Sequence, residues 1–200
     1  MSTHLKTLIS KLNDTCRRAA ERAASLCMAR GHYEVDLEHL FLALLEDPQS
    51  DFVLLCRREG LAASALQRDL EAEIGRFKNG NTRTPVFSPH LPVLLEHAWL
   101  IASLDGLQPR IRSAHLLLAL LTEPSLGQLA LRGSPLFSKF RLDDLKHRLP
   151  ELTQGSAEAS APGAAATGSA PPAEEAALPA AAGKTPALDQ YTTNLTQRAR

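Results

Sequence analysis

Residues 35–48 read Val-Asp-Leu-Glu-His-Leu-Phe-Leu-Ala-Leu-Leu-Glu-Asp-Pro, and residues 111–124 read Ile-Arg-Ser-Ala-His-Leu-Leu-Leu-Ala-Leu-Leu-Thr-Glu-Pro. The two stretches share the residue at 7 of 14 positions. A duplication of this kind indicates two similar helical units, each of which covers the apolar face of the other. We therefore predict an all-α, pseudo-twofold domain built from two helical units.

The spacing of apolar residues is helical through the first 150 residues, and no alternating strand pattern is present. Small residues between Cys16 and Cys27 form a stripe that lets another helix approach closely, and Gly31 is placed to end that helix in a left-handed cap. A short helix is expected over residues 51–58, closed by Gly60. The second unit is expected to start with Ser88 as the N-cap and Pro89 as the first helical residue.

These signals divide the chain into parts. The domain is expected over residues 1–150, with a first unit that ends at residue 78 and a second repeat over 86–150. Residues 151–186 contain 13 Ala, 5 Pro and 4 Gly and no aromatic residue. Such a segment has too little apolar bulk to offset the entropy of ordering, so we predict a disordered linker there.

Composition excludes several classes of function. Lys+Arg and Asp+Glu are both 22, so the chain offers no broad basic face, and we expect no nucleic-acid partner. The longest aliphatic run, 116–121, is far shorter than the roughly 20 residues of a membrane span, so no membrane association is expected. Three cysteines without a CxxC pair suggest a reducing compartment, and we predict a cytoplasmic protein.

The sequence offers no catalytic constellation. His39 and His115 occupy equivalent places near the starts of the two repeated helices, which favours a shared packing or capping role over metal or nucleophilic chemistry. Gly183-Lys184-Thr185 resembles the end of a phosphate-binding loop, but Leu178 stands where that loop requires glycine. We therefore predict no catalytic residue, no metal site and no cofactor within these 200 residues.

The stretch Gly31-His32-Tyr33-Glu34-Val35-Asp36-Leu37-Glu38-His39-Leu40 resembles the signature of the Clp/Hsp100 N-terminal domain, which is a tandem repeat of four-helix units. Residues 188–199 are similar to the entry into the first AAA+ ring domain of these unfoldases, so residues 187–200 are expected to begin that domain and the chain to continue past Arg200. The resemblance implies a hexameric ATPase that binds ATP and Mg²⁺ outside this segment. The isolated domain is expected to be monomeric.

Leu12-Asn13 is similar to the usual first residues of this family, so the resemblance implies a first repeat over 12–78 and an added helix over 1–11. An extra N-terminal helix resembles the ClpV branch of this family, the bacterial AAA+ ATPases of type VI secretion. That resemblance implies a partner: an amphipathic N-terminal helix of a contracted type VI sheath subunit (TssC/VipB-like), bound for ATP-driven sheath disassembly. The expected binding groove has one wall on the added helix and the other around the start of the next helix and the second repeat; its candidate residues are Leu5, Leu8, Ile9, Leu12, Thr15 and Phe87.

Other interpretations stay open at this point. The apolar stripe of the added helix could simply dock that helix onto the core, and Phe87 could be a hydrophobic staple before its helix. Within the family, the alternatives are a general ClpB-type disaggregase and an adaptor-binding ClpA/ClpC-type unfoldase. A free-standing helical regulator is a remote alternative.

Overall fold

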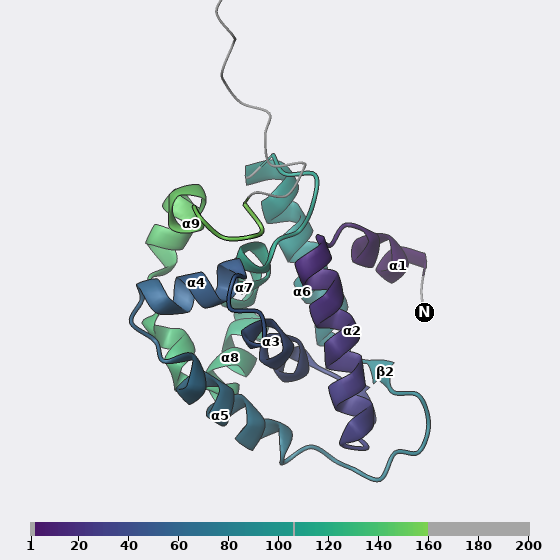
Figure 1. Ribbon diagram of the computed structural model, residues 1–200. Helices are drawn as coiled ribbons and strands as arrows, with labels where there is room; N and C mark the ends of the chain where they lie inside the picture. The colour runs from purple at the N-terminus through teal and green to yellow at the C-terminus, as the bar shows by residue number, and fades with distance from the viewer. Residues whose placement is uncertain (1–2, 106, 160–200) are drawn as a thin grey trace, which may run out of the picture. The chain divides into compact units, whose positions relative to one another are not determined.

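The computed structural model of the chain describes residues 3–105 and 107–159, and most of that part is helical (Figure 1). In chain order its elements are α1 (Thr3–Ser10), α2 (Asp14–Ala29), β1 (Glu34–Val35), α3 (Leu37–Leu45), α4 (Asp51–Arg58), α5 (Ala63–Ile74), β2 (Val86–Phe87), α6 (His90–Leu100), the π-helical segment η1 (Ile101–Asp105), α7 (Ser113–Thr122), α8 (Pro124–Gly133), the 3-10 helix η2 (Pro135–Lys139) and α9 (Leu142–Leu152). The all-α prediction is confirmed.

The two repeats are visible in the backbone pairing as well as in the order of helices. The Ser88 N–H donates to the Val35 carbonyl at 2.9 Å, and the Asn13 N–H donates to the Ile111 carbonyl at 2.9 Å. These are pseudo-equivalent contacts, because the segment before α3 pairs with the start of the second unit while the segment before α7 pairs with the start of the first. The first contact belongs to a two-residue parallel pair, β1 with β2, that the sequence did not predict.

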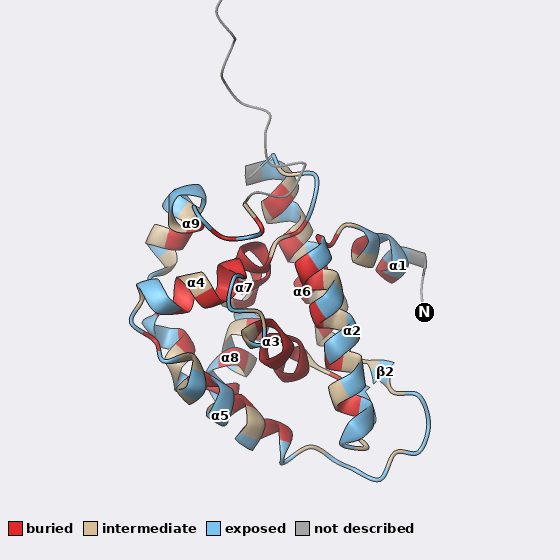
Figure 2. Cartoon of the chain, in the orientation of Figure 1, coloured by how far each residue is buried: buried red, intermediate tan, exposed pale blue. Residues whose placement is uncertain are grey.

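The repeated run forms the two central helices, α3 and α7. Nearly every residue of both is buried, which Figure 2 shows as red on all sides of the two helices. A helix that is apolar all round is stable only when other helices enclose it. The large side chains that are almost fully enclosed are Phe41, Phe52, Leu12, Leu44, Leu55, Leu66, Leu70, Ile74, Leu94, Ile111, Leu116 and Leu117.

Most predicted helix ends are confirmed. Gly31 has φ +66° directly after α2, and Gly60 has φ +67° after α4, as left-handed caps require. The predicted cap at Ser88 is wrong. Helix α6 begins at His90 after Pro89, and no side chain caps its N-terminus; the Ser88 hydroxyl donates to Asp36 Oδ1 at 2.7 Å.

The predicted start of the linker at residue 151 is also wrong. Helix α9 continues to Leu152, and Thr153, Ser156 and Glu158 are buried against the domain. The folded part therefore includes residues 151–159. The rest of the predicted linker, the Gly183-Lys184-Thr185 motif and the predicted AAA+ beginning at 187–200 lie outside the described residues.

Within the described ranges, no single helix is long and apolar enough to span a bilayer. Helices α7 and α8 would reach that length only together, across a bend of 103°.

Candidate functional site

Helix α1 is fastened to the second repeat by its backbone. The Ile111 N–H donates to the Lys11 carbonyl at 2.7 Å, and Asn13 returns a bond to the Ile111 carbonyl at 2.9 Å. Arg110 Nη1 donates to the Ser10 carbonyl at 2.7 Å, which satisfies an acceptor that the end of the helix leaves free. These bonds give α1 a fixed position beside α6, although the helix is only 8 residues long.

An apolar groove lies between α1, α2, α6 and β2. Figure 1 shows α1 and β2 on the same side of α2. The groove holds a small depression of about 30 Å³, roughly the volume of one water molecule. Every side chain around it is apolar: Leu5, Ile9, Leu12, Cys16, Ala20, Ala23, Val35, Leu40, Phe87, Leu91, Leu95 and Leu116.

The structure brings together four of the six predicted groove residues: Leu5, Ile9, Leu12 and Phe87. Leu8 and Thr15 do not line the groove. Leu8 is 4 % exposed and belongs to the hydrophobic core, so for this residue the docking interpretation holds. Thr15 is buried too, and its hydroxyl accepts a long hydrogen bond from Arg18 at 3.5 Å.

A partner could touch only the groove residues that are partly exposed. These are Ile9 on α1, Ala20 on α2 and Phe87 on β2. Further along the elements that flank the groove, Met28 is 52 % exposed and Val86 is 60 % exposed. An apolar surface bordered by helices suits the apolar face of another amphipathic helix, which needs no catalytic residue.

The sequence predicted that α2 lines the groove through Thr15, whereas the structure places Cys16, Ala20 and Ala23 of α2 there; the contribution of α6 was missed. Ala20 and Ala23 belong to the small-residue stripe, which we interpreted only as a surface for close helix packing. Because these side chains are small, they leave space at the groove. The small-residue stripe was therefore the feature of the sequence that could have predicted the contribution of α2. Leu91 and Leu95 carry no distinguishing signal, because leucines at this spacing are typical of any buried helical face.

His39 and His115 cap the two central helices, which confirms their predicted role. The Asp36 N–H donates to His39 Nδ1 at 3.1 Å, and the Arg112 N–H donates to His115 Nδ1 at 3.0 Å. Because each Nδ1 accepts a hydrogen bond, each neutral ring carries its proton on Nε2. Burial lowers the pKa of both histidines to about 4, so both rings are neutral at physiological pH.

One group of potential metal ligands meets in the described part of the chain. Donor atoms of Cys27, His32 and His39 lie within 4.8 Å of one another, although these residues are not close enough in sequence to suggest a site. The protonated His39 Nε2 donates to His32 Nδ1 at 3.0 Å, and this bond occupies both atoms. Burial raises the pKa of Cys27 to about 11, which keeps a thiol there. In this structure His32 and His39 form a buried hydrogen-bonded pair, and Cys27 lies beside them as a thiol.

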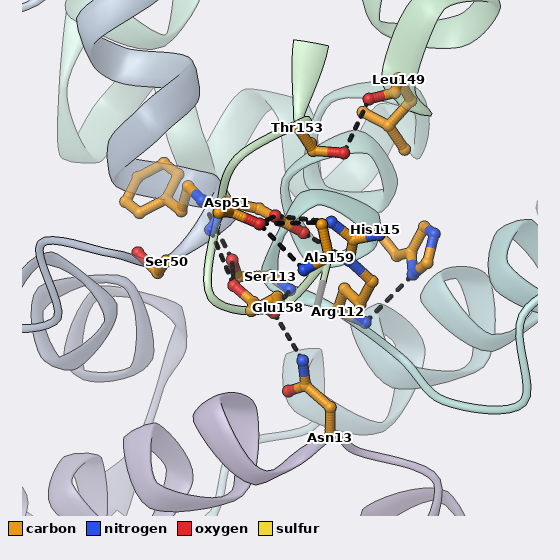
Figure 3. A network of polar contacts seen from close by, with 12 residues as sticks. Asn13, Ser50, Asp51, Arg112, Ser113, His115, Leu149, Thr153, Glu158 and Ala159 are labelled. Atoms are coloured by element: carbon orange, nitrogen blue, oxygen red, sulfur yellow. Dashed lines mark hydrogen bonds and ion pairs between the residues drawn. The ribbon is translucent and has the colours of Figure 1, made fainter. Parts of the chain in front are cut away.

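A buried carboxylate, Glu158, joins the two repeats near the groove (Figure 3). It is 2 % exposed and accepts from the Asp51 N–H and the Ser113 N–H at 2.8 Å each, from Asn13 Nδ2 at 2.6 Å, and from the Ser113 hydroxyl. Burial raises the pKa of Glu158, the Asp51 carboxylate raises it further, and the donors on Ser113 and Asp51 oppose that change. Asn13 Oδ1 in turn accepts from the Cys16 N–H at 2.8 Å, so Glu158 also positions the start of α2.

Comparison with known proteins identifies the domain. The family of Clp repeat N-terminal domains matches residues 11–134, which is more than half of the chain. The chain belongs to this family. The matched region starts at residue 11, directly after the end of α1 at Ser10.

The chain is similar in sequence to a ClpB protein and to a ClpV protein. The chain is 36 % identical to the chaperone protein ClpB of Yersinia enterocolitica over all of its own length, and 33 % identical to the AAA+ ATPase ClpV1 of Pseudomonas aeruginosa over 96 % of its length. It spans only 23 % and 22 % of these two proteins, respectively. The chain therefore spans less than a quarter of the length of each relative.

Solved structures resemble the fold closely. The N-domain of ClpV from Vibrio cholerae has a TM-score of 0.70 and 35 % identity, covering 79 % of this chain and 94 % of that one. A complex of a ClpV N-domain with a VipB peptide has a TM-score of 0.69 and 35 % identity, covering 79 % and 96 %. The Hsp104 N-terminal domain of Candida albicans, at 16 % identity and a TM-score of 0.57, shares the fold alone.

Proposed function

We propose that this domain is the substrate-recognition part of a ClpV-type AAA+ ATPase and that its groove binds an amphipathic N-terminal helix of a type VI sheath subunit. The longer protein would use the captured helix to draw contracted sheath into a hexameric ring for ATP-driven disassembly. ATP and Mg²⁺ would bind in ring domains outside this segment.

The observation that carries the proposal is the place of α1. This helix precedes the Clp repeat region, yet it is fastened to the second repeat and supplies Leu5 and Ile9 to the groove, with Leu12 directly after it. A solved structure of similar fold is a ClpV N-domain in complex with a VipB peptide, at 35 % identity. By adding apolar side chains along one side of the groove, α1 enlarges the surface against which a partner helix can pack.

Calorimetric titration of the 200-residue chain with a synthetic sheath-subunit N-terminal helix tests this proposal. Ile9→Glu and Phe87→Ala should each weaken binding by about 2 kcal/mol or more, because they remove apolar contacts at the centre of the interface. Tyr33→Ala is the matched control, since Tyr33 is an aromatic residue that is 45 % exposed and does not line the groove. Its affinity should equal that of the wild type.

A thermal melt of each variant separates binding from folding. The proposal fails if Phe87→Ala binds the helix normally, or if the wild-type chain does not bind it.

The relation to ClpB supports a second candidate, a general disaggregase domain. Deletion of residues 1–11 distinguishes the two candidates: loss of sheath-helix binding by a folded domain favours the ClpV type. Retained binding to an unfolded model protein, with no sheath-helix binding by either form, favours the disaggregase.

A further inference from the structure

A second cavity, of about 660 Å³, lies between η1, α7 and α9. It shares no lining residue with the groove. Ala114 and Leu118 of α7 line it together with Ile101 of η1 and Leu149 of α9, so much of its wall is aliphatic. Its volume falls within the range of about 300–1,000 Å³ that is typical of ligand sites in proteins.

His115 contributes an unused hydrogen-bond donor to this cavity. The residue is 4 % exposed, and its Nδ1 is occupied by the Arg112 N–H. The proton of the neutral ring is therefore on Nε2, the nitrogen on the other side of the ring, which carries no dashed line in Figure 3 and has no partner among the described residues. Because His115 lines the cavity, this N–H is open to it, and a ligand that accepts a hydrogen bond from Nε2 can replace water there.

Arg112 contributes a second free donor. Its Nε and Nη2 donate to the two Asp51 oxygens at 2.8 and 2.7 Å, and Nη2 also reaches Ser156 at 3.4 Å. Nη1 has no hydrogen-bond partner in the described ranges, and Arg112 lines the cavity. Asp51 balances the charge of this guanidinium, because the two groups form a buried ion pair.

Lys146 adds the positive charge that nothing balances. It lines the cavity, its side chain is exposed, and it makes no ion pair with any residue that the structure describes. No Asp or Glu is among the described side chains that line the cavity. The wall thus combines aliphatic surface, two directed N–H donors and one net positive charge, a combination that suits a monoanion better than a dianion.

We propose that this cavity binds a single carboxylate attached to an aliphatic group. The carboxylate would accept from His115 Nε2 and Arg112 Nη1, and its aliphatic part would contact Leu118 and Leu149. An acidic residue in an apolar peptide and a free branched carboxylic acid both present this chemistry.

Nuclear magnetic resonance of the whole chain at neutral pH tests the site with matched probes. The blocked tripeptide Leu-Glu-Leu should shift the His115 imidazole N–H and the amides of residues 112–118. It should bind about tenfold more tightly than the isosteric tripeptide Leu-Gln-Leu, because a hydrogen bond to a charged acceptor is much stronger than one to a neutral acceptor. Titration with 4-methylpentanoate and its amide shows whether a free acid suffices.

Variants locate the effect. Lys146→Gln should weaken carboxylate binding about threefold, as expected for an exposed charge, whereas Lys139→Gln should leave it unchanged, because Lys139 is exposed and does not line the cavity. Binding of the tripeptide and the free acid, or of either alone, supports the site and identifies its source. Equal binding of the charged and neutral probes, stronger binding of inorganic phosphate, or shifts confined to the groove would overturn it.

Discussion

Replacing Glu158 with alanine should destabilise the domain by about 3–5 kcal/mol, although the sequence suggests that this residue lies in a linker. The change leaves four buried donors unsatisfied, from Asn13, Asp51 and Ser113. Each buried donor that loses its acceptor costs about 1–3 kcal/mol. The variant no longer buries a carboxylate, and the desolvation free energy saved in this way offsets part of that total. The remainder is the size typical of removing one partner from a buried charged contact.

Urea unfolding followed by circular dichroism measures this loss, and the thermal midpoint should fall by about 10 °C or more. Glu151→Ala is the matched control, since the Glu151 side chain is 69 % exposed and should change stability by less than about 0.5 kcal/mol. Glu158→Gln should be intermediate, because its amide oxygen still accepts while its NH₂ group faces donors. A loss below about 1 kcal/mol for Glu158→Ala would refute the packing of residues 151–159 described above.

Four further substitutions, of which Gly127→Ala is a control, test separate features of the fold. Burial raises the pKa of Glu38 to about 7, against about 4.3 in an unfolded chain, so the folded state binds more protons between these values and stability falls as pH rises through them. Glu38→Gln removes that loss, so its free energy of unfolding should gain on the wild type by up to about 3 kcal/mol between about pH 4 and pH 8, and an unchanged pH profile would contradict the burial. Gly31→Ala should cost about 1–2 kcal/mol in urea unfolding, because φ is +66° and an added Cβ would lie 3.4 Å from the Gly80 nitrogen. Gly127→Ala, at a helical glycine with Cβ contacts of 3.7 Å, should be neutral or stabilising by up to about 1 kcal/mol, and equal losses at both glycines would count against the left-handed cap. Leu8→Ala should lower the thermal midpoint, at a cost of about 2 kcal/mol or more, while the intrinsic affinity for the sheath helix changes little; an affinity loss without a stability loss would return Leu8 to the groove.

The fold was predictable where one feature occurs twice. The duplicated run fixed the identity of α3 and α7, and the two histidine caps followed from their equivalent positions. Packing of residues 151–159 was not predictable, because it depends on a few polar contacts, chiefly those of Glu158, from an Ala- and Gly-rich stretch. The partners of Glu158, which are Asn13, Asp51 and Ser113, are at least 45 residues away in the sequence. The local composition of residues 151–159 carries no information about contacts at such a distance.

The groove was predictable in part for a related reason. Helical spacing places Leu5, Leu8, Ile9 and Leu12 on one apolar face. Only part of that face lines the groove, because Leu8 does not. Leu8 is turned into the core while Ile9 stays partly exposed, a difference that depends on how α1 is rotated against α6. The rotation is set by the backbone bonds to Ile111, which lies in the other repeat.

The central claim is that a sheath-subunit helix lies against Ile9, and isoleucine methyl labelling tests it directly. The chain has Ile at 9, 74, 101 and 111, and only Ile9 lines the groove, while Ile101 lines the second cavity and Ile74 is fully buried. With the sheath helix bound, intermolecular nuclear Overhauser contacts should connect the peptide to the Ile9 methyl group and leave Ile74 and Ile101 without any. Contacts to Ile101, or saturated binding with none to Ile9, would contradict the groove as the binding site.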